Sequence, residues 1–216
     1  MEASTSRPNA PSLAERAYRI RRNALRMGEV QGQGYIAQAL DIADILAAAY
    51  FHAMRFRPED PSWEGRDRFL LSNGHYAIAL YAALIEAGIN PEAELETHGS
   101  DESRLSMSGM ASYTPGIEMS GGSLGLGLSI AVGRALGLKR KGSDARIFIL
   151  FSDGELDTKA KHGAWCLVRA FPPVHSRSAA CHRESEGAPR SRTDRRRGLS
   201  AGLPYWDERG CLGHHG

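Results

Sequence analysis

The sequence predicts an α/β fold, a doubly wound parallel sheet with helices on both faces. Two short apolar runs, at residues 68–72 and 146–151, have the length and composition of buried strands. Helical patterns lie before and between these runs, and each run ends in a polar turn that contains glycine. Ligands of such sheets bind beyond the carboxyl ends of the strands, so these two turns are the first candidates for a functional site.

Two helices are expected before the first strand. Apolar side chains recur at helical spacing from Pro11 to about Glu29, which predicts an amphipathic helix. A loop with spaced glycines at residues 31–34 leads to a second helix, from about Ala37 to Met54. This second segment is apolar on most sides, and we therefore expect it to be largely buried.

A third helix should follow the first strand, from His75 to about Ala87. Residues 97–117 are polar and rich in Gly, Ser and Met, and loops of this length usually carry function or stay mobile. The glycine-rich segment 121–127 leads into a fourth helix. The second strand, residues 146–151, is apolar after its first residue, which suits the middle of a parallel sheet.

The composition changes abruptly after residue 157. Residues 1–157 carry 16 basic and 20 acidic side chains, whereas residues 158–216 carry 11 and 5. All three Cys lie in the second part, which contains no Ile, Met or Asn. We therefore expect a disordered N-terminus at residues 1–10, a folded domain at 11–157 and a disordered, Arg-rich tail at 158–216.

The chain has the overall composition of a globular protein. It contains no run of eighteen apolar residues, so no membrane span is expected. Its first residues lack the apolar core of a secretion signal, and a cytoplasmic location is the default.

Three features near the strand ends have both functional and purely structural explanations. Asp153 and Gly154 could bind a divalent cation and a phosphate, or could form an ordinary turn. The glycines of residues 121–127 could expose amides to an anion, or could allow close helix packing. His75 directly follows a strand-ending turn, where a histidine is either catalytic or structural. None of these features alone decides between the two explanations.

Taken together, three motifs resemble transketolase, specifically the separate N-terminal subunit of split bacterial transketolases. They are residues 66–75 (RDRFLLSNGH), residues 114–125 (TPGIEMSGGSLG) and residues 151–157 (FSDGELD). Their order and spacing agree with the family, and the resemblance covers about residues 15–157.

The resemblance implies a thiamine diphosphate site. Asp153 would bind the Mg²⁺ that holds the diphosphate, and Gly154 would lie against the diphosphate. His75 would lie at the reaction centre near the thiazolium, and Gly122 and Leu124 would line the pyrimidine side. The cofactor acts as the electron sink for a carbanion, while the protein supplies orientation and proton relays.

The resemblance also implies an activity and a partner. Enzymes of this family move a two-carbon ketol unit between sugars or sugar phosphates. The glutamate that activates the aminopyrimidine belongs to the other half of the enzyme. We therefore expect a hetero-oligomer with a C-terminal, pyrimidine-binding transketolase subunit, and we expect neither a nucleic acid nor a membrane as partner.

The chain departs from the family at three positions. Tyr35 occupies the place of a histidine that touches the substrate, and we count it with His75 as a candidate catalytic residue. A second histidine is replaced near Ser108, and Leu126 replaces a polar residue. Tyr and Ser donate hydrogen bonds but do not exchange a proton near neutral pH as His does. The resemblance therefore does not identify phosphorylated pentoses as the substrate.

The larger departure begins at Thr158. The family continues with Glu-Gly-x-Thr-Trp, a helix, and a strand that ends in an Asn of the metal site. The tail has neither an Asn nor a β-rich apolar run, so we expect a sheet that is incomplete at its C-terminal end and a chain that is inactive as it stands. An Arg-rich nucleic-acid-binding tail, a Cys/His metal-binding tail and a change of reading frame all remain possible explanations.

The genetic code favours the change of reading frame. Residues 158–163 are TKAKHG. Reading one frame over, from the last base of the Thr158 codon, the permitted codons include GAA, GGC, CAA, ACA and TGG. These encode Glu-Gly-Gln-Thr-Trp, the continuation typical of the family.

Two alternative functions stay open. One is the decarboxylating first component of a 2-oxoacid dehydrogenase, which also uses thiamine diphosphate and shares the Asp-Gly-Glu region. The other is a non-catalytic, Arg-tailed binding protein. Ketol transfer from a sugar would exclude both.

Overall fold

The computed structural model describes residues 10–156, 205–206 and 212–213. The expected N-terminal segment 1–10 and the expected tail 158–216 lie almost entirely outside the described residues. The main unit contains two strands and several helices, in this order: α1 (Leu13–Gln31), α2 (Ile36–Ala48), the π-helix η1 (Ala49–Ala53), β1 (Arg68–Leu71), η2 (Gly74–Tyr76), α3 (Ala77–Glu86), η3 (Glu92–Thr97), α4 (Leu126–Arg140), β2 (Ile147–Leu150) and α5 (Asp153–Leu156). In a separate unit, β3 (Tyr205–Trp206) and β4 (Leu212–Gly213) pair antiparallel.

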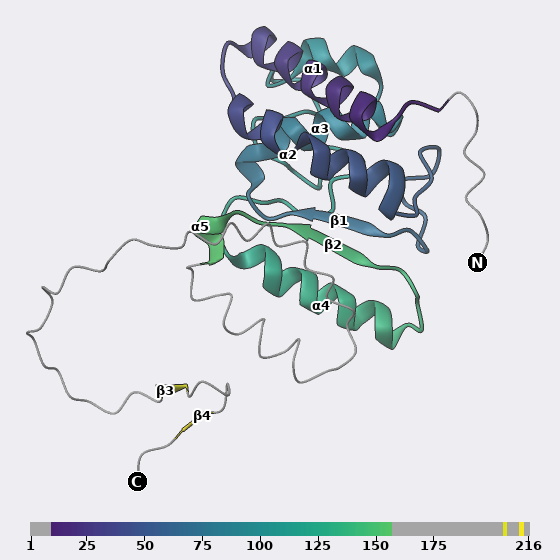
Figure 1. The fold of residues 1–216 in the computed structure, drawn as a ribbon, viewed down its shortest axis with the longest axis vertical. Helices are drawn as coiled ribbons and strands as arrows, with labels where there is room; N and C mark the ends of the chain where they lie inside the picture. The colour runs from purple at the N-terminus through teal and green to yellow at the C-terminus, as the bar shows by residue number, and fades with distance from the viewer. Residues whose placement is uncertain (1–9, 157–204, 207–211, 214–216) are drawn as a thin grey trace, which may run out of the picture. The chain divides into compact units, whose positions relative to one another are not determined.

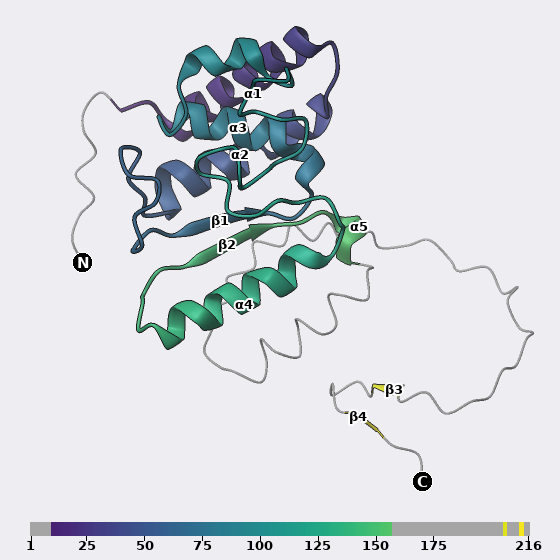
Figure 2. The ribbon, with the colours of Figure 1, turned by 180° about the vertical axis from the view of Figure 1, so that it is seen from behind.

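Strands β1 and β2 form a parallel pair between two layers of helices, as the sequence predicts (Figure 1). Helices α1, α2 and α3 lie on one side of the pair and α4 on the other, and the reverse view shows the same arrangement (Figure 2). The side chains alternate accordingly, because successive residues of a strand point to opposite faces. The layer of α1–α3 packs against the side chains of Phe69, Leu71, Phe148 and Leu150. The opposite face of the pair, on the α4 side, carries Leu70, Ile147 and Ile149.

Helix α1 confirms the predicted amphipathic pattern. Its buried positions include Ala17, Ile20, Ala24 and Met27, which recur at the period of a helix. The hydroxyl of Ser12 caps the first turn by accepting a hydrogen bond from the backbone N–H of Glu15, at 3.1 Å.

Helices α2 and α3 supply most of the remaining core. Every residue of α3 from Ala77 to Ile85 is buried, and α3 packs against both α1 and α2. The helix predicted to run to Met54 changes after Ala48 into the π-helical turn η1. There the ring of Tyr50 lies 5.7 Å from that of Phe69, centroid to centroid, so η1 anchors the helical layer to β1.

Strand β2 differs from the expectation of a central strand. Within the described residues its only strand neighbour is β1, and all four of its residues are partly exposed. The four residues of β1 are buried. The difference arises because no described strand covers the second edge of β2. Among the helices of the described residues, none is long and apolar enough to cross a membrane.

The starts of both strands are held by the buried carboxylate of Asp67. Its side chain is fully buried and accepts hydrogen bonds from the backbone N–H groups of Arg55, at 2.9 Å, and Arg146, at 2.7 Å. The guanidinium groups of both arginines also reach it, at 3.3 Å and 2.6 Å. Burial by itself would raise the pKa of Asp67, but the hydrogen bonds from Arg146 and Arg55 outweigh burial and lower it. Asp67 therefore joins the η1–β1 connection to the start of β2.

Replacing Asp67 should destabilise the fold markedly. Asp67→Ala leaves two backbone N–H groups and two guanidinium groups without their acceptor. We expect the free energy of unfolding to fall by about 2–4 kcal/mol. This is less than for a fully buried pair, because both arginines are half exposed. Urea unfolding followed by circular dichroism measures it. The matched control is Asp144→Asn, which removes the exposed second partner of Arg55. Equal urea midpoints for the two variants would contradict the role of Asp67.

Acid should also weaken the fold through His98. This ring is 1% exposed, and neither of its nitrogens makes a hydrogen bond of ordinary geometry within the described residues. Burial lowers the pKa of His98 below 6.5, and the backbone of Met27 opposes this shift only in part. The unfolded chain therefore binds the proton more readily, so stability is complete above pH 6.5 and falls as the pH drops toward the folded pKa.

The test is the slope of unfolding free energy against pH, measured between pH 7 and pH 5. We expect His98→Gln to have a shallower slope than the unchanged chain, by at most about 1.4 kcal/mol per pH unit. Parallel slopes for the two proteins would show that His98 is not buried in its neutral form.

Candidate functional site

The ends of β1 and β2 meet at one edge of the sheet. Leu71 pairs with Leu150, and the backbone N–H of Ser72 donates to the carbonyl of Leu150, at 3.0 Å. The two polar turns that follow, residues 72–75 and 152–155, therefore begin side by side. The parallel register thus brings together two motifs that are about 80 residues apart in the sequence.

The glycine-rich segment 121–127 packs directly onto the turn after β1. A Cβ on Gly74 would lie 2.4 Å from the backbone carbon of Gly121, and a Cβ on Gly127 would lie 2.2 Å from Oγ of Ser72. Only glycine permits these approaches. For Gly121 and Gly127 the structure thus favours close packing as the reason for the glycine.

Gly122 and Leu124 lie on the exposed side of the same segment. Gly122 has a φ of 148°, and among the described residues beyond its chain neighbours no atom lies within 4 Å of the place where its Cβ would be. The Leu124 side chain is 49% exposed. Both residues are therefore accessible to a ligand or a partner.

Asp153 and Gly154 follow β2 and form the first turn of α5. Both residues are exposed, and Gly154 has open space around its Cβ position. Within residues 10–156, the carboxylate of Asp153 makes no hydrogen bond or ion pair. An exposed, unpaired carboxylate beside an unobstructed glycine is suited to a cation and an anionic group bound together.

His75 and Tyr35 lie in contact although they come from different elements. Tyr35 precedes α2 and is 49% exposed, and His75 lies in η2. Their ring centroids are 4.8 Å apart in an edge-to-face arrangement, and the ring of Tyr76 lies 4.4 Å from that of His75. The structure thus brings together the two side chains that the sequence singles out as candidate catalytic residues.

The residues at this edge fit a diphosphate cofactor held through a divalent cation. Asp153 offers carboxylate oxygens, and Gly122 and Gly154 leave room for a group close to the backbone. In the turn after β1, Oδ1 of Asn73 is buried and has no hydrogen-bond partner within the described residues. One carboxylate alone is a small ligand set for Mg²⁺, which normally takes further oxygens from water or phosphate.

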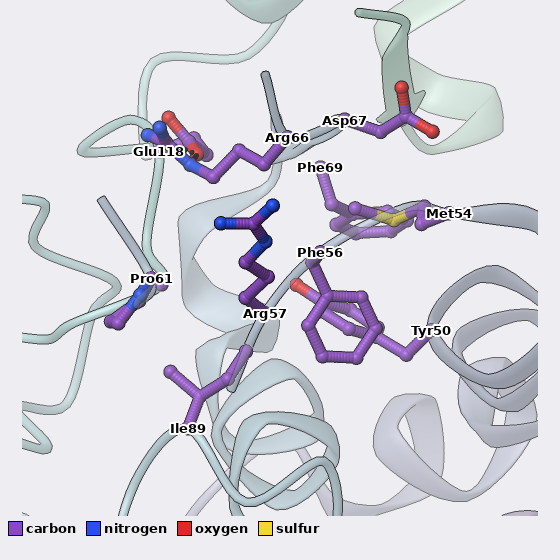
Figure 3. Close-up of a pocket in the computed structure, with 11 residues that line it drawn as sticks. Tyr50, Met54, Phe56, Arg57, Pro61, Arg66, Asp67, Phe69, Ile89 and Glu118 are labelled. Atoms are coloured by element: carbon purple, nitrogen blue, oxygen red, sulfur yellow. Dashed lines mark hydrogen bonds and ion pairs between the residues drawn. The ribbon is translucent and has the colours of Figure 1, made fainter. Parts of the chain in front are cut away.

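A small pocket lies elsewhere, at the start of β1, and Figure 3 shows its lining. Its volume is about 20 Å³, enough for about one water molecule and far too small for a cofactor. Arg66 and Glu118 on its wall are joined in an ion pair of 2.9 Å, and Arg134 also pairs with Glu118. We assign this pocket to packing, because it is at the opposite end of β1 from the candidate site.

Sequence reasoning missed the residue that links these parts. Glu155 is 2% exposed, and Oε1 accepts hydrogen bonds from Oγ of Ser72, at 2.5 Å, and from the backbone N–H of Gly125, at 3.0 Å. Oε2 accepts from the backbone N–H of Ser152, at 2.9 Å. The sequence signal for Glu155 was a charged side chain that closely follows a buried strand, in a turn whose other residues, Ser152, Asp153 and Gly154, are small.

Comparisons with known proteins identify the family of this chain. The family described as the thiamine diphosphate binding domain of transketolase matches residues 14–164. A putative uncharacterized transketolase family protein of Sinorhizobium fredii is 77% identical over 146 residues, which cover 68% of this chain and 52% of that protein. A 6-deoxy-6-sulfo-D-fructose transketolase subunit of Clostridium is 39% identical over 145 residues, covering 67% of this chain and 53% of that subunit.

Solved structures show the same relationship. The structure of transketolase from Campylobacter jejuni is similar with a TM-score of 0.66 at 29% identity, covering 70% of this chain and 25% of that chain. This chain spans about half the length of the curated relatives named above. Since the family match includes both strand-end turns and the glycine segment between them, the chain belongs to the transketolase family through its thiamine diphosphate binding domain.

Proposed function

We propose that this chain is the diphosphate-binding, N-terminal part of a two-subunit transketolase that transfers a ketol unit between sugars. The observation that carries the proposal is the shared sheet edge, where the exposed Asp153–Gly154 turn follows β2 and the His75 turn follows β1. The family match covers both turns and favours ketol transfer over the decarboxylation of a 2-oxoacid.

In this proposal the cofactor is thiamine diphosphate with Mg²⁺. Asp153 binds the cation, Gly154 lies against the diphosphate, and Gly122 and Leu124 lie on the pyrimidine side. The exposure of all four residues supports these roles. Bound thiamine diphosphate would supply the electron sink that a ketol transfer requires.

His75 and Tyr35 are the proposed substrate-facing pair. His75 is proposed to relay protons, a role for which histidine is the usual side chain, whereas the Tyr35 hydroxyl orients a substrate by hydrogen bonding. Their edge-to-face contact restrains both rings, which favours a fixed direction for each polar group. We propose a sugar or sugar phosphate as substrate, with Tyr35 as a residue that helps to select it.

The proposed partner is a C-terminal subunit that supplies the pyrimidine-binding half. Two facts support a hetero-oligomer. One relative, the Clostridium protein, is described by its name as a transketolase subunit. In addition, Tyr35 and Leu124 are both half exposed at the candidate site, as expected of residues that a second subunit covers.

Cofactor binding tests the proposal directly. We expect the full chain to bind thiamine diphosphate in a Mg²⁺-dependent manner by isothermal titration calorimetry. Asp153→Ala should weaken that binding at least about tenfold, because it removes the charged oxygen ligands of the cation. The matched control is Asp144→Ala, another exposed aspartate near the opposite end of β2. Equal affinities for the two variants, or none in the unchanged chain, would contradict the proposed site.

Residues 158–216 differ in composition from the rest of the chain. We propose that a change of reading frame between the codons of Asp157 and Thr158 produced this segment. Independent sequencing of the DNA should then reveal a frame that continues into Glu-Gly-x-Thr-Trp. Confirmation of the frame as it stands would refute this explanation and would leave residues 158–216 as a true part of the chain.

A further inference from the structure

Glu155 joins three separate segments at the candidate site. Its two carboxylate oxygens accept hydrogen bonds from Ser72 at the end of β1, from Gly125 in the glycine-rich segment, and from Ser152 at the end of β2. In turn, Oγ of Ser72 accepts from the backbone N–H of Gly127, at 3.2 Å. One buried carboxylate thus connects the ends of both strands to the start of α4.

These bonds should be strong for a physical reason. A buried carboxylate is costly unless it is hydrogen-bonded, and bonds to an ionised acceptor are about twice as strong as neutral ones. Glu155 is 2% exposed, so water does not replace these donors easily. The network therefore resists displacement of any of the three segments.

The position of Glu155 relates this network to the residues proposed to hold the cofactor. The backbone N–H of Glu155 donates to the carbonyl of Ser152, at 3.2 Å, and the N–H of Ser152 donates to the Glu155 carboxylate. These two bonds close a tight loop around Asp153 and Gly154. The other oxygen holds Gly125, three residues after Gly122.

From these contacts we infer that Glu155 is a positioning residue, which holds the glycine-rich segment and the Asp153–Gly154 turn at a fixed separation suited to one cofactor. It acts through its neighbours and is not itself proposed to touch the cofactor. The cofactor part of this inference rests on the proposed function. The structural part, that Glu155 fixes residues 121–127 against the strand ends, does not.

The test compares four variants of the full chain. Glu155→Gln keeps the shape of the side chain but replaces one carboxylate oxygen by an NH₂ group. In either orientation of the amide, this NH₂ group faces a backbone N–H, that of Ser152 or that of Gly125, and cannot accept its hydrogen bond. Glu155→Asp keeps the charge but is one methylene too short to reach both sides. Ser72→Ala removes the hydroxyl that links Glu155 to Gly127. The matched control is Glu86→Gln, which alters another shielded glutamate, paired with Arg16 at 2.6 Å at the far end of α3.

The first readout is hydrogen exchange measured by mass spectrometry. Relative to Glu86→Gln, we expect the backbone amides of Gly125 and Gly127, which donate to Glu155 and Ser72, to exchange at least about tenfold faster in Glu155→Gln and in Ser72→Ala. Exchange in α1 should be the same in the Glu155 and Ser72 variants as in the unchanged chain. Unchanged exchange at residues 121–127 in the Glu155 and Ser72 variants would overturn the inference.

The second readout is the Kd for thiamine diphosphate with Mg²⁺. We expect at least about a tenfold weaker Kd in Glu155→Gln, a partial recovery in Glu155→Asp, and no change in Glu86→Gln. Faster exchange with an unchanged Kd would overturn the positioning role. If the unchanged chain binds no cofactor, the proposed function fails instead, and the exchange data alone then decide whether Glu155 holds the segment.

Discussion

The parallel pairing of β1 with β2 is the constraint on which the rest of this domain depends, and buried carboxylates hold it at both ends. Asp67 joins the starts of the two strands through Arg55 and Arg146. Glu155 joins their ends through Ser72 and Ser152. A pair of four-residue strands buries little surface by itself, so both the register and the separation of its ends depend on these charged contacts as well as on the helices packed against each face.

The two ends differ in what the carboxylates organise. At the start of the strands, Asp67 pairs with arginines whose outer parts remain in water, and its loss would leave their N–H groups without an acceptor. At the other end, Glu155 holds backbone N–H groups and hydroxyls that belong to the turns around the candidate site. The glycines at positions 74, 121 and 127 then allow the segments to approach within distances that no side chain would permit. Close backbone packing and the hydrogen bonds of Glu155 thus occur at the same edge of the sheet.

Several residues at this edge of the sheet are exposed. Asp153, Gly122 and Leu124 are accessible, and Tyr35 covers only part of the imidazole of His75. Exposed apolar side chains and an exposed carboxylate thus occur on the segments that border this edge.

The sequence alone determined the alternation of helices and strands, the amphipathic face of α1 and the placement of His75 and Asp153 at strand ends, because these depend on local periodicity and on turn residues. It did not indicate the π-helical end of α2, whereas the partial exposure of β2 agrees with the sheet that the sequence predicts to be incomplete at its C-terminal end. Nor did it identify Glu155 or Ser72, whose importance comes from partners 83 residues apart. Only the tertiary structure decided which glycines pack and which leave space, since that difference is set by the distance between two backbones and not by the identity of the residue.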